Sequence, residues 1–136
     1  MRTLAEATVV AIAVVASACA SAPAATCKTG EQSAVSETLY LGTGKPNGVV
    51  TADEWTSFLA TVVTPRFPQG LTVFQANGQW RGADGSIVRE STYVLQLVHP
   101  DDTPNEKSVA EIAAAYKAQF LQEAILRTKA STCISF

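Results

Sequence analysis

The chain has 136 residues, which is the length of a single domain, and 47% of its residues are hydrophobic. Its formal net charge is −2 at pH 7, and no block of basic residues occurs. A nucleic-acid partner is therefore not expected, because binding to phosphates requires a basic surface.

The N-terminus has the features of an export signal. Arg2 precedes the apolar run ATVVAIAVVASA, residues 7–18, which is too short for a stable membrane anchor. Residues 16–19, ASAC, resemble the lipobox of a bacterial lipoprotein, in which Cys19 becomes the lipidated first residue. Ordinary signal cleavage within residues 18–25 is the alternative. We therefore expect a periplasmic or extracellular protein, attached to the membrane only if Cys19 carries a lipid.

We divide the chain into a signal peptide (1–18), a flexible tether (19–36) and one α+β domain (37–136). Two cysteines remain, Cys27 and Cys133, and an exported protein matures where disulfides persist. We expect these cysteines to be joined.

The first half of the domain reads as a strand followed by a helix. The segment ETLYLGTG, residues 37–44, alternates apolar and polar side chains and predicts a strand. Thr51 and Glu54 form a capping box, which predicts the start of a helix. The helix should end near Val63, because Pro65 disfavours helical geometry in the preceding residue. Its apolar stripe comprises Trp55, Phe58, Leu59 and Val62.

A hairpin follows. Residues 71–82 and 87–99 predict two strands joined by the turn GADG at 82–85. Asn77 and Gly78 predict a bulge or kink within the first of these strands.

The remaining segments predict a second helix and a last strand. HPDDTPNEK, residues 99–107, is typical of a polar loop, so the helix should begin near Ser108. Residues 124–136 predict a strand, with an interruption near 130–131. The expected buried stripe of the helix comprises Val109, Ile112, Ala113, Tyr116, Phe120 and Ala124.

The order β-α-β-β-α-β predicts a ferredoxin-like fold, with a four-stranded antiparallel sheet and both helices on one face. In that fold the last strand lies beside the first. Cys133 then lies near Cys27, so the predicted disulfide and the predicted fold agree.

Catalytic residues are sparse. His99 is the single histidine, and with Asp101 and Asp102 it offers a weak metal or acid–base site; a solvated loop residue is the alternative. Tyr40 is a second weak candidate. The serine elbow G-x-S-x-G is missing, and too few ligands cluster for a closed metal site. We therefore predict no metal, no cofactor and no established catalytic centre.

A binding surface is the stronger hypothesis. Trp80 and Arg81 lie on a strand, so they point to opposite faces, and one of them points to the face without helices. Tyr40 is expected on that face, with arginines at its rim that bind a carboxylate or phosphate. Alternatively, Trp80 packs against Phe67 and Pro68 as a core residue. The predicted binding residues are Arg66, Trp80, Arg81 and Arg89.

The run VTPRFPQGLTVFQANGQWRG, residues 63–82, together with LQLVHPDD and the terminal CISF, is similar to bacterial exported proteins of domain-of-unknown-function family 3574. The resemblance covers about residues 36–136. It implies a small secreted or lipoprotein domain and implies no activity.

Two functions remain open from the sequence. The first is a non-catalytic cell-envelope domain that binds a small ligand or an envelope protein, with possible dimerisation through its open sheet face. The second is a small ferredoxin-like enzyme, with a cavity between sheet and helices that uses Tyr40, His99 or Arg66.

Overall fold

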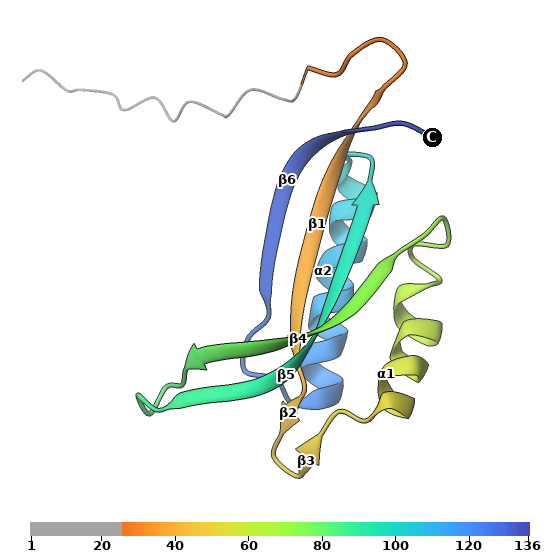
Figure 1. The fold of residues 1–136 in the computed structure, drawn as a ribbon. Coiled ribbons are helices and arrows are strands. Elements are labelled where there is room, and N and C mark those ends of the chain that lie inside the picture. Colours follow the sequence, from red (N-terminus) through yellow and green to blue (C-terminus); the bar gives the residue numbers. More distant parts are fainter. Residues whose placement is uncertain (1–25) are drawn as a thin grey trace, which may run out of the picture.

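A computed structural model describes residues 26–136 (Figure 1). The predicted signal peptide, Cys19 and the first part of the tether lie outside these residues. The elements are β1 (Gln32–Gly42), β2 (Gly44–Lys45), β3 (Gly48–Val49), α1 (Ala52–Phe58), η1 (Leu59–Val63), β4 (Thr72–Arg81), β5 (Ile87–His99), α2 (Thr103–Phe120) and β6 (Leu126–Ile134).

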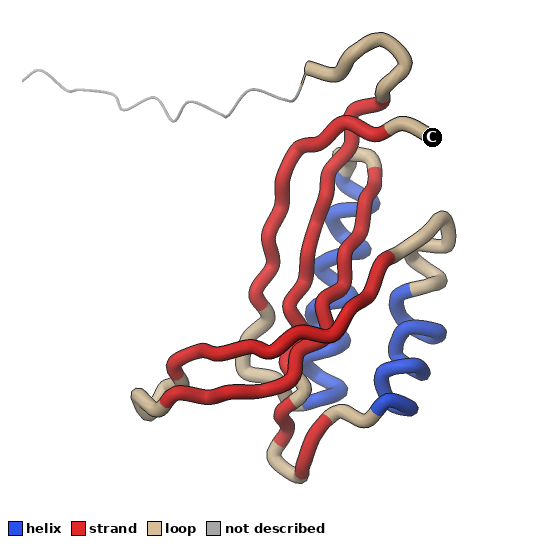
Figure 2. Tube along the Cα trace, in the orientation of Figure 1, coloured by secondary structure: helices blue, strands red, loops and turns tan. Residues whose placement is uncertain are grey.

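Four long strands form one antiparallel sheet in the order β4-β5-β1-β6, and β2 pairs with β3 in a separate short ribbon. Both helices lie on the same face of the sheet (Figures 1 and 2). The antiparallel sheet and its two helices confirm the expected α+β class. The pairing of β6 with β1 confirms that the last strand lies beside the first.

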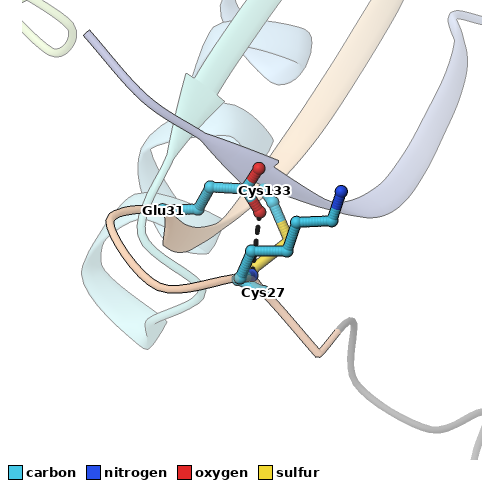
Figure 3. Close-up of a disulfide and its surroundings, with 4 residues drawn as sticks. Cys27, Glu31 and Cys133 are labelled. Carbon is cyan, nitrogen blue, oxygen red and sulfur yellow. Dashed lines mark hydrogen bonds between the residues drawn. A yellow bond between two sulfur atoms is a disulfide. The ribbon is translucent and has the colours of Figure 1, made fainter.

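The predicted disulfide is present. Cys27 and Cys133 are bonded, with Cα atoms 5.6 Å apart, and Figure 3 shows Glu31 beside them. These three residues form the one group of potential metal ligands found within residues 26–136. The two sulfur atoms are bonded to each other, so neither is a thiolate that could hold a metal.

The core fills the space between sheet and helices, and it follows the predicted periodicities. Leu39 and Leu41 of β1 are buried, as alternation predicts. Trp55 of α1 stacks on Tyr93 of β5, with ring centroids 4.3 Å apart. The hydroxyl of Tyr116 donates a hydrogen bond to the carbonyl of Gly42 at 2.9 Å, which joins α2 to the end of β1. The buried residues of α2 are Val109, Ile112, Tyr116 and Phe120, as predicted. Of the two remaining residues of the predicted stripe, Ala113 is partly buried and Ala124 lies beyond the end of the helix.

β1 is longer than expected, and β6 is continuous where an interruption was expected. β1 begins at Gln32, five residues before the predicted start, because its pairing with β6 extends to Gln32 opposite Ile134. Residues 32–36 therefore belong to the sheet and not to a tether. β6 also continues through Ala130, which pairs with Ser36, so the expected interruption was wrong.

The start of α2 was also predicted wrongly. The helix begins at Thr103, within the segment expected to be a loop. The Asp102 side chain caps it by accepting a hydrogen bond from the amide of Asn105 at 2.8 Å. Pro104 does not prevent this, because amides in the first turn of a helix have no partner within it.

The first helix follows the prediction more closely. Thr51 and Glu54 form the capping box, and the last helical residue is Val63. The final turn, η1, has π-helical hydrogen bonding.

The hairpin of β4 and β5 carries a projecting end, residues 78–90, which we call the arm. In Figure 1 the arm turns away from the long axis of the other strands. Pairing is continuous through Asn77 opposite Ser91 and Gly78 opposite Glu90, so the predicted bulge does not occur. Both strands bend together (Figure 1), which agrees with the alternative of a kink. The predicted turn is present, and the Gly82 amide donates to the Ser86 carbonyl at 2.9 Å.

Candidate binding pocket

The sheet face opposite the helices, which we call the uncovered face, carries large apolar side chains. Strand register places Tyr40 beside Val94 and Leu126, with Phe74 opposite Val94 from the other side. Its exposed apolar residues are Tyr40 (39% exposed), Phe74 (51%), Trp80 (40%), Val98 (45%) and Leu126 (61%). Contiguous exposed apolar patches are typical of interaction surfaces and of ligand-binding grooves.

A pocket of about 450 Å³ lies at the arm end of this face. Its walls come from the arm, from β1 and β5, from residues 122–124 in the connection between α2 and β6, and from Leu126 of β6. The residues that determine its chemistry are Tyr40, Trp80, Glu90, Gln122, Glu123 and Leu126. The pocket is therefore built where the bent arm meets the α2–β6 connection.

Glu90 is fixed in this pocket by two hydrogen bonds. The Gly44 amide donates to one carboxylate oxygen at 2.7 Å, and the Trp80 indole Nε1–H donates to the other at 3.1 Å. Among the ion pairs formed by residues 26–136, none includes Glu90. Its charge is held in place by neutral donors.

Two glycines make room for the Glu90 carboxylate. A β-carbon at Gly42 would lie 2.6 Å from Glu90 Oε1, and one at Gly44 would lie 3.0 Å from Oε2. Any larger residue at position 42 would displace the carboxylate. The chain therefore leaves a gap that the carboxylate fills.

Gln122 ties the pocket's rim to the β2 segment. Its side-chain amide donates to the carbonyl of Gly44 at 2.5 Å and to that of Phe120 at 3.2 Å. Glu123, next to it, also lines the pocket. The described residues that line the pocket include two carboxylates and no lysine, arginine or histidine. Both charged side chains of its lining are therefore negative.

Trp80 lies in this pocket and not in the core. It is 40% exposed on the arm, whereas Phe67 is buried next to His99, with ring centroids 5.5 Å apart. The alternative in which Trp80 packs against Phe67 and Pro68 was therefore wrong. Tyr40, predicted as a weak catalytic candidate, is the second aromatic wall of the pocket.

The three predicted arginines do not join Trp80. Arg66 lies at the end of η1, where it donates to the Val62 carbonyl at 2.8 Å and pairs with Glu111 of α2 at 3.2 Å. Arg81 follows Trp80 in β4, and Arg89 follows Val88, the residue paired with Trp80, in β5. Side chains alternate between the two faces of a sheet, so both arginines point to the face opposite that of Trp80. Arg89 donates to Gln79 Oε1 at 2.8 Å. The expected arginine rim for an anion is absent from the pocket.

His99 is buried on the helix side, so the expectation of a solvated loop residue was wrong. It is 4% exposed, and its Nε2 lies 3.4 Å from Glu37 Oε1. The expected grouping with Asp101 and Asp102 does not occur, because Asp102 caps α2 and Asp101 pairs with Lys129.

Glu37 belongs to a buried ion-pair network. Arg127 donates to both of its carboxylate oxygens, at 2.6 and 2.7 Å, and also pairs with Glu106 of α2 at 2.8 Å. Hydrogen bonding to Glu37 raises the pKa of Arg127, and hydrogen bonds from Lys129 and Arg127 lower the pKa of Glu106. The network joins β1, β6 and α2, and Glu37 itself is fully enclosed. We assign it a structural role.

Within residues 26–136, no helix is long and apolar enough to cross a membrane. A comparison with curated proteins found no match.

Among solved structures, a phage SAM lyase in complex with S-methyl-5'-thioadenosine has a similar fold. Its TM-score is 0.59 at 11% identity, over 76% of this chain and 90% of that one. The same lyase in its apo state gives a TM-score of 0.50 at 13% identity, over 82% and 95%. CutA from Synechococcus elongatus has a TM-score of 0.48 at 9% identity, over 78% of this chain and 83% of that one. At these identities the first two comparisons show the fold alone. The model of the family described as protein of unknown function (DUF3574) matches residues 36–136, and the chain belongs to that family.

Proposed function

We propose that this protein is an exported, non-catalytic domain that binds a small ligand in the pocket on the uncovered face. The observation that carries the proposal is the Glu90 carboxylate, held by Gly44 and Trp80 in a gap that glycines leave for it. Ligand sites typically combine an apolar hollow with a few well-placed polar groups, and this pocket has that composition.

The alternative, an enzyme with a cavity between sheet and helices, has less support. The buried cluster packs into that space. Tyr40 lies on the uncovered face, His99 lies on the helix face, and Arg66 lies beside Glu111 on α2. These three side chains do not face one substrate.

Export and the ferredoxin-like topology are parts of the same proposal. A disulfide between Cys27 and Cys133 is typical of proteins that mature outside the reducing cytosol. Lipidation at Cys19 remains a proposal from the sequence. The strand order β4-β5-β1-β6 with both helices on one face supports the ferredoxin-like arrangement.

A second candidate is a homodimer, or a complex with an envelope protein, through the rest of the uncovered face. Phe74 and Val98 are exposed there and lie outside the pocket. Light scattering of the purified protein tests this candidate. A dimer that Phe74→Ser converts to a monomer supports it, whereas a monomer at all concentrations removes it.

The proposal is tested by screening small molecules against the protein by ligand-observed NMR. Compounds that bind the pocket should lose affinity at least about tenfold in Trp80→Ala, because an aromatic wall is removed. Phe74→Ala is the matched control: it removes an exposed aromatic side chain from the same face, outside the pocket. If Trp80→Ala and Phe74→Ala leave the binding of every compound unchanged, the pocket is not the ligand site.

A further inference from the structure

We infer that the pocket selects a small organic cation that carries a flat apolar group. The inference rests on the proposed function and specifies the chemistry of the ligand. It comes from the charge, hydrogen-bonding capacity and aromatic surface that the pocket combines.

The charge of the pocket favours a cation. Glu90 faces it without a basic partner among residues 26–136, and Glu123 adds a second carboxylate at the rim. The nearby Lys45 does not offset them, because both oxygens of Glu54 accept hydrogen bonds from its ammonium group, at 2.6 and 2.8 Å. A bound anion would meet two carboxylates without a cationic side chain in the pocket lining.

Glu90 also retains hydrogen-bonding capacity. A carboxylate has about four acceptor sites, and the amide of Gly44 and the indole of Trp80 use two of them. Because both donors are part of the protein, the carboxylate is oriented before a ligand arrives. An ammonium group of the ligand would form a charge-assisted hydrogen bond to it.

The walls favour a flat apolar group next to that cation. Trp80 uses its edge N–H for Glu90, so its ring faces remain for stacking or for a cation–π contact. Tyr40 and Leu126, paired across β1 and β6, supply further apolar surface to the same pocket. The resulting site has a negative end and an aromatic end.

Three probes with one phenyl ring and different head groups separate charge from shape. They are phenethylamine (cation), 2-phenylethanol (neutral) and phenylacetate (anion). Each is titrated into the purified protein at pH 7 while the ¹H–¹⁵N signal of the Trp80 indole is followed. We expect phenethylamine to bind about tenfold more tightly than 2-phenylethanol, because a charged hydrogen bond replaces a neutral one, and phenylacetate to bind most weakly.

Glu90→Gln should abolish the preference for the amine, because it removes the negative charge. It also replaces one of the two acceptor oxygens by an NH2 donor, so the hydrogen bond from Gly44 or from Trp80 is lost, and the affinity for 2-phenylethanol measures this second effect. Glu111→Gln, at a carboxylate outside the pocket, is the matched control and should keep the preference. Glu123→Gln provides a second variant on an exposed loop, independent of any effect of Glu90→Gln on folding. It should reduce the preference by a smaller factor.

The outcomes distinguish the two claims. Equal binding of all three probes, or tightest binding of phenylacetate, overturns the cation inference and leaves the pocket as a ligand site. If no probe shifts the Trp80 indole signal, both claims fail. A dimeric mass in that case identifies a second copy as the occupant of the uncovered face.

Discussion

A β-carbon at position 42 would lie only 2.6 Å from Oε1 of Glu90, which is closer than a β-carbon can approach another atom. Glycine at 42 is thus explained by a side chain on the neighbouring strand and not by backbone conformation. The sequence could not predict this, because glycine at the end of a strand is also typical of a turn. Trp80 was identified from sequence, whereas its hydrogen bond to Glu90 depends on the hairpin register.

We therefore predict that Gly42→Ala lowers the free energy of unfolding by about 1 to 2 kcal/mol, because it displaces Glu90 from Gly44 and Trp80. Urea denaturation measures this change. In a Glu90→Ala background the same substitution should cost much less. An equal cost in both backgrounds would show that the carboxylate does not require the glycine.

Glu37 is a charged residue at a core position of β1, and alternation alone would have placed an apolar side chain there. Arg127 compensates its charge from β6. We predict that Glu37→Ala lowers the free energy of unfolding by about 3 kcal/mol, because it leaves a partly buried guanidinium without its bidentate partner. Glu111→Ala, which breaks the exposed pair with Arg66, should cost less than about 1 kcal/mol. Similar losses in the two variants, measured by urea denaturation, would contradict the structural role of Glu37.

At the scale of elements, the sequence predicted the interior of each strand and helix better than the ends. Periodicity predicted β5 with the bounds that the structure shows, Ile87–His99. The predicted start of α2 was wrong because Asp101, Asp102 and Pro104 are typical both of a loop and of the capped first turn of a helix. The extension of β1 to Gln32 depends on pairing with β6, which local sequence does not encode.

The contribution of the contact between α2 and β6 to the stability of the protein should depend on pH. Hydrogen bonds from Lys129 and Arg127 hold the pKa of Glu106 below its ordinary value of 4.5. A carboxyl group whose pKa is lowered on folding stabilises the protein above pH 4.5, and this contribution disappears as the pH falls below that value. Glu106→Gln should therefore be less stable than the wild type at pH 7, and the difference should be smaller at pH 3. A difference in melting temperature that is the same at both pH values would contradict this account.

At the scale of the whole molecule, one covalent bond joins the two ends of the domain. The disulfide links the segment before β1 to the end of β6, at a sequence separation of 106. Fold and pairing could both be predicted, because the strand order β-α-β-β-α-β brings the ends together. The pocket could not, since it depends on the direction in which the arm bends, which no local pattern specifies.

Replacing both cysteines by serine should lower the free energy of unfolding by about 4 to 5 kcal/mol, the loop-entropy value for a loop of this length. Urea denaturation of the variant and of the oxidised wild type gives the difference. A loss below about 1 kcal/mol would show that the disulfide restrains the unfolded chain little.

The central claim is that the uncovered face holds a ligand pocket beside the arm. The most direct test is a titration with a small molecule that binds in the NMR screen. The changes in amide and indole chemical shifts are then mapped over the whole domain. The account predicts that the largest changes cluster at Gly42, Trp80, Glu90 and Leu126, with the indole of the core residue Trp55 unchanged. Changes centred on the helix side, around His99 and Glu37, would contradict it and would favour a site between sheet and helices.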